Sequence, residues 1–182
     1  SIPVDGTPCR FRTTADVDLL PLSITDVVHE ASPPTSPQLR LQFQTTEQGR
    51  AAVFQPDGIR LFLSGEPALS MAVLLWIFRY CKSITVKGLS PKARSVKLPS
   101  KNVRLCGIDP SQPLLPWGHF ASDGYRLLQE YFTLPQKFLF FDIRGLEAAA
   151  SVAEDKFEIS FQFERPPQLP GRIAKEMFRL NC

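Results

Sequence analysis

The sequence has few of the side chains that carry catalytic or metal chemistry. It contains 2 histidines and 4 cysteines in 182 residues, and it has no C-x-x-C pair of the kind found in zinc modules. The motifs of P-loop nucleotide-binding proteins, α/β-hydrolases, zinc proteases and dinucleotide-binding folds are also missing. We therefore expect no cofactor, no metal and no enzymatic activity.

The cysteines are spread singly, at Cys9, Cys81, Cys106 and Cys182. A chain of this size can build a hydrophobic core without disulfide bonds, so we expect reduced cysteines that pack as small hydrophobic side chains. Cys106 or Cys182 would need an adjacent base to act as a nucleophile, and the sequence offers no recognisable one.

Long hydrophobic runs are absent as well. The longest strongly apolar stretch covers residues 71–78, which is too short to cross the ~30 Å hydrocarbon core of a membrane. This excludes a transmembrane helix and predicts no direct membrane insertion. The chain starts at Ser1 without an initiator methionine and stops at Cys182, so we expect residues 1–182 to be one domain from the central part of a longer protein.

Proline and phenylalanine are the abundant residues, with 17 prolines and 14 phenylalanines, and both favour sheets and loops. Residues 157–163 alternate most clearly, with phenylalanine or isoleucine at every second position. Shorter apolar or alternating runs predict further strands within residues 9–13, 20–24, 39–43, 59–63, 83–86, 103–106 and 138–141. The fold class is therefore predicted to be α+β, with mainly antiparallel, sandwich-like sheets and two packed helices.

The first helix is predicted over residues 66–81. Ser64 is its expected cap, and the unbroken apolar run after Ala72 predicts that most of its circumference is buried. The second helix is predicted over residues 123–133, with Asp123 as its N-cap and Pro135 as its stop. In that helix the apolar side chains Tyr125, Leu128 and Phe132 share one face, and Arg126, Gln129 and Glu130 are predicted to face water.

The charges are distributed unevenly along the chain. Residues 67–108 carry eight basic side chains and no acidic one, whereas the other 140 residues have a net charge of −5. This segment is a candidate partner contact, although it also fits a solvated surface. Its aromatic residues lie in the apolar helix and are not interleaved with the lysines, so we expect no nucleic-acid partner. The candidate contact residues are Lys82, Lys87, Lys92, Arg94, Lys97, Lys101 and Arg104.

A second candidate contact is the proline-rich loop at residues 107–120, which carries the apolar side chains Leu114, Leu115 and Trp117. It is predicted to lie on the protein surface as a strap. The strap either contacts a partner or is held only against its own domain.

Asp142 is the carboxylate most in need of a partner, because it lies within an apolar strand segment. Arg144 is two residues further along, so both side chains should point to the same face of a strand and form a buried structural pair. A hydrolase would need an acid and a base in one pocket, and Asp142 with His119 is the only pairing the sequence offers.

Several motifs together resemble one known family. Residues 125–146 read Y-R-L-L-Q-E-Y-F-T-L-P-Q-K-F-L-F-F-D-I-R-G-L, which is similar to a segment of the TssF family of bacterial type VI secretion baseplate subunits, also called VasA or ImpG. The segments G-T-P-C-R-F-R-T at 6–13, L-F-L-S-G-E at 61–66 and F-R-L-N-C at 178–182 resemble other landmarks of the family in the same order. At positions 134 and 136 the family motif more commonly has phenylalanine and glutamate, whereas this sequence has Leu134 and Gln136. Pro135 is kept between them, so the helix is still expected to end there.

The resemblance implies a cytoplasmic structural role without catalytic residues. TssF-like proteins associate with TssG-like and TssK-like subunits, with a TssE-like sheath initiator and with a second TssF copy, and their baseplate docks at the inner membrane and nucleates the contractile tail. The chain would be the middle portion of such a subunit. A β-domain that binds an anion or glycan is the alternative, and it predicts a concave pocket with convergent polar groups. A hydrolase is the third and weakest hypothesis.

Overall fold

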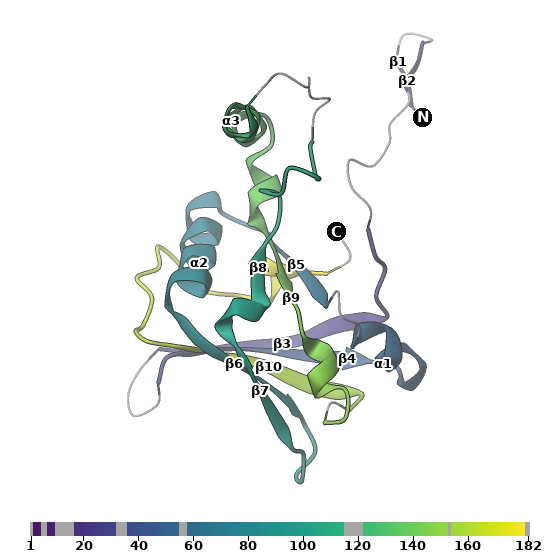
Figure 1. The fold of residues 1–182 in the computed structure, drawn as a ribbon, viewed down its shortest axis with the longest axis vertical. Helices are drawn as coiled ribbons and strands as arrows, with labels where there is room; N and C mark the ends of the chain where they lie inside the picture. Colours follow the sequence, from purple (N-terminus) through teal and green to yellow (C-terminus); the bar gives the residue numbers. More distant parts are fainter. Residues whose placement is uncertain are drawn as a thin grey trace.

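Two antiparallel β-sheets make up most of the structure. The computed structural model describes residues 2–4, 7–9, 17–31, 36–54, 58–114, 122–152 and 154–180. The larger sheet has the strand order β3–β4–β10–β6–β7, and the smaller sheet has the order β11–β5–β9–β8. In Figure 1 the strands of the smaller sheet run across the direction of those in the larger sheet. This architecture confirms the predicted α+β class.

The strands of the larger sheet are β3 (Leu22–Glu30), β4 (Gln38–Thr45), β10 (Lys156–Phe163), β6 (Cys81–Gly88) and β7 (Ser95–Pro99). Those of the smaller sheet are β11 (Phe178–Arg179), β5 (Ile59–Leu63), β9 (Phe140–Ile143) and β8 (Val103–Leu105). A separate hairpin pairs β1 (Ile2–Val4) with β2 (Thr7–Cys9). The α-helices are α1 (Glu47–Val53), α2 (Pro67–Tyr80) and α3 (Asp123–Thr133), and the 3₁₀ helices are η1 (Ser100–Asn102), η2 (Pro135–Leu139), η3 (Leu146–Ala149) and η4 (Lys175–Met177).

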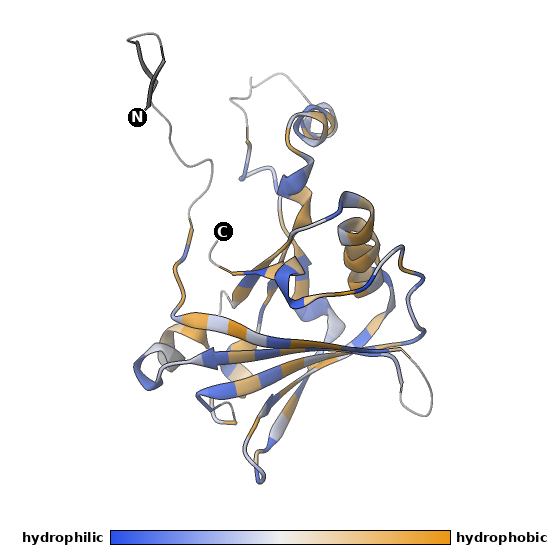
Figure 2. Cartoon of the chain, turned by 180° about the vertical axis from the view of Figure 1, so that it is seen from behind, coloured by the Kyte–Doolittle hydropathy of each residue, from blue (hydrophilic) through white to orange (hydrophobic). Residues whose placement is uncertain are grey.

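The larger sheet is built on the alternation of apolar and polar residues. Phe157 of β10 lies opposite Phe43 of β4, and their rings stack with centroids 5.3 Å apart. Phe161, two strand positions before the end of β10, is fully buried and lies opposite Leu39. Figure 2 shows the resulting exchange of apolar and polar positions along these strands. One face of the sheet therefore forms the core, and the other carries polar side chains.

The smaller sheet covers this core with Ile59, Leu61 and Leu63 of β5, which are all fully buried. Gly58 precedes them with φ of 77°, and a Cβ at this position would lie 2.0 Å from the carbonyl oxygen of Ile143. The chain therefore needs glycine where it enters β5. The predicted turn begins at Pro56 and Asp57, which lie outside the described residues.

Helix α2 packs on the larger sheet through Trp76, whose ring stacks on Phe163 at a centroid distance of 3.7 Å. The side chain of Glu66 caps the helix by accepting hydrogen bonds from two backbone amides, so the prediction of Ser64 as the cap was wrong. Leu75 and Phe78 are exposed, so the apolar run overestimated how much of the helix is buried.

Three other elements differ from the prediction. Helix α1 was not predicted, because its sequence carries polar residues without a clear period, and strand β7 was not predicted, because its alternation is limited to two apolar positions, Val96 and Leu98. The apolar run at 138–141 does not begin as a strand, because Pro135 starts the 3₁₀ helix η2, which holds Phe138, and β9 begins only at Phe140. The strand predicted at 9–13 is described only at Cys9, the end of β2.

None of the helices in the described ranges is long and apolar enough to span a bilayer.

The burial of β10 predicts a contrast between two identical substitutions. Phe161→Ala is expected to lower the free energy of unfolding by about 3–5 kcal/mol, because it leaves a cavity in a packed core. Phe132→Ala, at a site that is 77% exposed, should change it by less than about 0.5 kcal/mol. Urea denaturation measures both values, and equal losses would contradict this assignment of the core.

Candidate docking surfaces

Helix α3 turns its apolar face outward and its charged face inward. Phe132 is 77% exposed and Tyr125 is 57% exposed, whereas Arg126 is 1% and Glu130 0% exposed. Arg126 and Glu130 were predicted to face water, so that assignment is corrected. The period of the sequence identified the two faces correctly, but it did not show which face would meet the rest of the protein.

The buried carboxylate of Glu130 explains this orientation. Lys137 of η2 donates to its Oε2 at 2.7 Å, and the backbone amide of Leu114 donates to its Oε1 at 2.7 Å. The Nη1 of Arg126 lies 3.3 Å from both carboxylate oxygens. A buried carboxylate is tolerated only when it is paired and hydrogen-bonded. These donors therefore allow the charged Glu130 to occupy a buried position where α3 meets η2 and the loop after β8.

The same donors set the charge of Glu130. Burial on its own would raise the pKa of this carboxyl, but the hydrogen bonds from Lys137 and from the amide of Leu114 and the charges of Lys137 and Arg126 together hold the pKa below its ordinary value of 4.5. Glu130 is therefore ionised at neutral pH, and it links α3 to η2 and to the loop that follows β8.

That loop is the start of the predicted strap. Its residues 109–114 are held against α3 and η2, because Lys137 also donates to the carbonyl oxygen of Gln112 at 2.6 Å and Arg126 donates to that of Asp109 at 3.4 Å. Leu114 is half-buried at this contact. Leu115, Trp117 and His119 lie outside the described residues.

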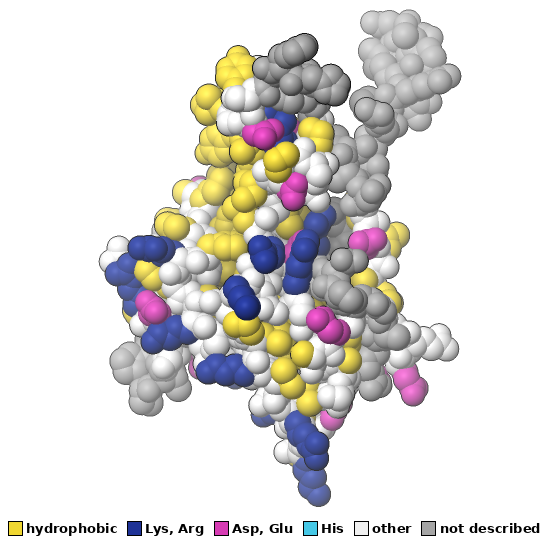
Figure 3. Space-filling model, viewed as in Figure 1, with side chains coloured by type: hydrophobic (Ala, Val, Ile, Leu, Met, Phe, Trp, Pro, Cys, Tyr) yellow, Lys and Arg dark blue, Asp and Glu magenta, His cyan; other side chains and the backbone are white. Residues whose placement is uncertain are grey.

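The outward face of α3 presents a cluster of apolar side chains. Tyr131 contacts both Phe132 and Phe138, with ring centroids 5.7 and 5.9 Å apart. Figure 3 shows hydrophobic side chains gathered over α3, at the end of the molecule away from the larger sheet. Contiguous exposed apolar surface is a common feature of protein interaction sites. We call it the α3 face, and it consists of Tyr125, Leu128, Tyr131 and Phe132.

Asp142 lies at the centre of a second cluster, on the outer face of the smaller sheet. Arg60 donates to both of its oxygens, at 2.8 and 3.1 Å, and Arg144 donates to Oδ2 at 3.2 Å. The thiol of Cys106 donates to Oδ1 at 3.1 Å. Sequence reasoning named Arg144 but missed Arg60, which is 82 positions away and reaches Asp142 only through the pairing of β5 with β9.

These contacts fix the protonation of both acidic groups in the cluster. Burial would raise the pKa of Asp142, but the hydrogen bonds and charge of Arg60, with those of Cys106 and Arg144, hold it below its ordinary value. Burial and the adjacent carboxylate raise the pKa of the Cys106 thiol to about 12. The ionised Asp142 is thus engaged in structural ion pairs, and Cys106 is held as a thiol and not as the nucleophilic thiolate.

The seven predicted basic contact residues are all exposed, but they do not form one surface. Lys87 and Lys97 belong to β6 and β7 of the larger sheet, Lys92 and Arg94 lie in the turn between these strands, and Arg104 lies on β8 of the smaller sheet. Lys82 is on β6 and Lys101 on η1.

The described part of the chain includes a groove that bears on the anion- or glycan-binding alternative. An open groove of about 380 Å³ is lined by buried Leu22 and Phe178 and by the exposed side chains of Ser23, Lys175 and Glu176, among others. Within the same residues, no three histidine, cysteine or acidic side chains come together as metal ligands would. His29 packs edge-on against Trp76 with centroids 5.2 Å apart, and burial lowers its pKa.

The role of Glu130 predicts a pH-dependent loss of stability. Glu130→Gln is expected to lower the free energy of unfolding by about 3–5 kcal/mol at neutral pH, because the buried Arg126 would lose its nearer and buried counter-charge and keep only the exposed Asp123 at 3.8 Å. The pKa of Glu130 is lowered in the folded state, so its contribution is complete above the ordinary value of 4.5 and is lost as the pH falls through the folded value. The difference between variant and wild type should therefore shrink in acid.

Urea denaturation over a pH series measures this difference. Glu147→Gln provides the control, because Glu147 is an exposed glutamate in η3. A difference that grew as the pH fell would contradict the assigned role of Glu130.

Comparisons with known proteins agree on one family. The family model described as "Type VI secretion system, TssF" matches residues 1–182. The "Type VI secretion system component TssF1" of Pseudomonas aeruginosa is 28% identical over 194 residues, which cover 99% of this chain and 31% of that protein.

A solved structure has the same fold. A chain in the cryo-electron microscopy structure of the "type VI secretion system TssK-TssF-TssG baseplate subcomplex" superposes with a TM-score of 0.81 at 24% identity, over 95% of this chain and 33% of that chain. The present chain therefore spans about a third of the length of these two proteins. Because the family model covers every residue, this chain belongs to the TssF family of the type VI secretion system.

Proposed function

We propose that the chain is a structural scaffold component of a type VI secretion baseplate wedge, and that it assembles with TssG-like and TssK-like subunits. Membership of the TssF family supports this role, as does the shared fold with a chain of a TssK-TssF-TssG baseplate subcomplex. The proposal extends to a TssE-like sheath initiator and a second TssF copy as partners, to nucleation of the contractile tail, and to a cytoplasmic location at the docked baseplate.

The observation that carries this proposal is the α3 face. A helix that buries its charges and exposes two tyrosines, a leucine and a phenylalanine leaves much of the apolar surface of those side chains in contact with water. The same side chains suit a helix that lies in the apolar groove of a partner subunit. Helix α3 lies at one end of the molecule (Figure 1), and the side chains of this face are 44–77% exposed.

Co-purification tests the role of the α3 face. The double variant Leu128→Glu and Phe132→Glu should lose binding to a TssG-like or TssK-like subunit that is co-expressed with it, because two charges would be placed in an apolar interface. Both positions are exposed, so the thermal unfolding temperature should stay within a few degrees of wild type.

Leu19→Glu is the matched control, because Leu19 is also an exposed leucine, at 79%, and lies before β3. It should leave co-purification unchanged. If the α3 variant still bound both subunits as wild type does, α3 would not be the docking surface, and the proposal would lose its structural basis.

A further inference from the structure

Arginines line up across the outer face of the smaller sheet. The strand registers place Arg60 of β5 and Arg104 of β8 directly opposite Asp142 of β9 on either side. Directly opposite residues in antiparallel strands point to the same face of a sheet. Arg144 follows Asp142 by two residues and shares its carboxylate. Three arginines thus surround a single acidic group.

The carboxylate of Asp142 is saturated by the donors that it already has. A carboxylate offers about four lone-pair sites, and Asp142 accepts two hydrogen bonds from Arg60, one from Arg144 and one from Cys106. The ion pairs within the described residues do not include Arg104. The cluster therefore has a net charge of +2. Some guanidinium N–H groups of its arginines have no hydrogen-bond acceptor within the cluster.

These donors are both accessible and oriented. The side chains of Arg60 and Arg144 are 39% and 52% exposed, whereas that of Asp142 is 5% exposed. The buried carboxylate fixes the two guanidinium groups and leaves their remaining N–H groups directed away from it. Figure 3 shows basic side chains gathered around an acidic one over β8 and β9.

We propose that the face formed by Arg60, Arg104 and Arg144 binds a carboxylate-bearing segment of a partner protein. This inference deepens the proposed scaffold role and rests on it for the identity of the partner. Guanidinium groups that are already oriented bind carboxylates by paired hydrogen bonds at a low entropic cost. Charge complementarity therefore selects an acidic segment.

A protein partner fits this face better than a nucleic acid. Binding to a nucleic acid backbone requires a long track of cations that contacts successive phosphates, whereas this face is only a few strands wide and has a carboxylate at its centre. The neighbouring aromatic rings of Phe62 and Phe140 pack on each other, with centroids 4.6 Å apart, and are not free as platforms for bases.

Fluorescence anisotropy with a labelled hexaglutamate peptide tests the inference on the intact chain. The double variant Arg104→Gln and Arg144→Gln should weaken binding of the peptide at low ionic strength by at least about tenfold. Arg60 is kept, because it supplies two of the four hydrogen bonds that the buried Asp142 accepts, whereas Arg144 supplies one. Circular dichroism should show an unchanged fold, since both substituted side chains are exposed.

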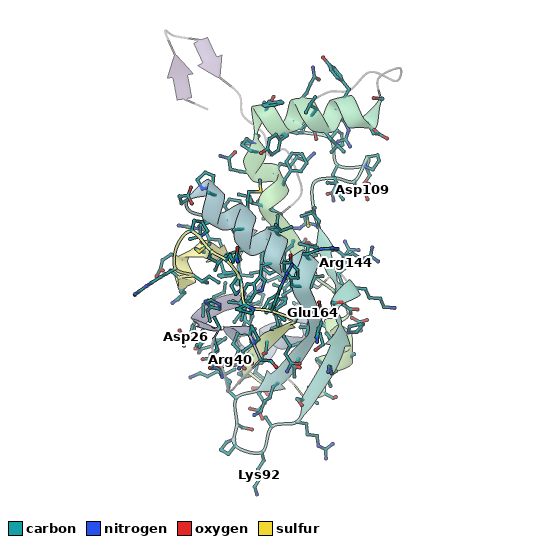
Figure 4. All side chains as sticks on the ribbon, turned by 90° about the vertical axis from the view of Figure 1, so that its left-hand side faces the viewer. Asp26, Arg40, Lys92, Asp109, Arg144 and Glu164 are labelled. Atoms are coloured by element: carbon teal, nitrogen blue, oxygen red, sulfur yellow. The ribbon has the colours of Figure 1, made fainter. Side chains whose placement is uncertain are left out.

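The matched control removes the same charge elsewhere. Lys92→Gln with Arg94→Gln alters the turn between β6 and β7, and Figure 4 shows Lys92 at the tip of this turn, far from Arg144. The control should change the affinity by less than about twofold. Equal losses in the two double variants would show that only the overall charge attracts the peptide, and this would overturn the proposal.

Two further outcomes would also overturn it. The first is failure of wild type to bind hexaglutamate more tightly than a hexaserine peptide. The second is that wild type binds a thymidine hexanucleotide more tightly than hexaglutamate, and that the Arg104 and Arg144 double variant loses this binding. That result would indicate a nucleic-acid site. Neither result depends on α3, so co-purification through the α3 face would be judged separately.

Discussion

The buried carboxylate of Glu130 is the constraint on which the orientation of α3 depends. It collects Lys137 from η2, the amide of Leu114 from the preceding loop and Arg126 from its own helix. These contacts hold the helix through its polar side, so the apolar side is left at the surface. The electrostatic contact inside the fold thus determines the hydrophobic surface outside it.

The smaller sheet uses a second buried carboxylate in a similar way. Asp142 joins β5, β9 and the end of β8, because its donors come from all three. Cys106 takes part as a neutral donor, because burial and the adjacent carboxylate raise the pKa of its thiol to about 12.

Local patterns in the sequence predicted much of the fold. The alternation in residues 157–163 identified the central strand β10, and Pro135 marked the end of α3. The rotation of α3 could not be predicted in this way, because its period separates two faces without revealing that Lys137 and Leu114 supply donors to one of them. Arg60 was missed for a related reason, since only the register of β5 against β9 brings it to Asp142. In each case a long-range hydrogen bond, which leaves no periodic signal, decided the outcome.

The orientation of α3 also bears on how such subunits can diverge. Residues that hold the helix in place, such as Glu130, lie on one side of it, and those available to a partner, such as Phe132, lie on the other. Substitutions on the outer side leave the internal contacts intact and carry little cost in folding stability. Under the proposed docking role of α3, partner specificity can therefore change without rebuilding the domain. A helix that used one apolar face both for core packing and for docking would couple stability to specificity.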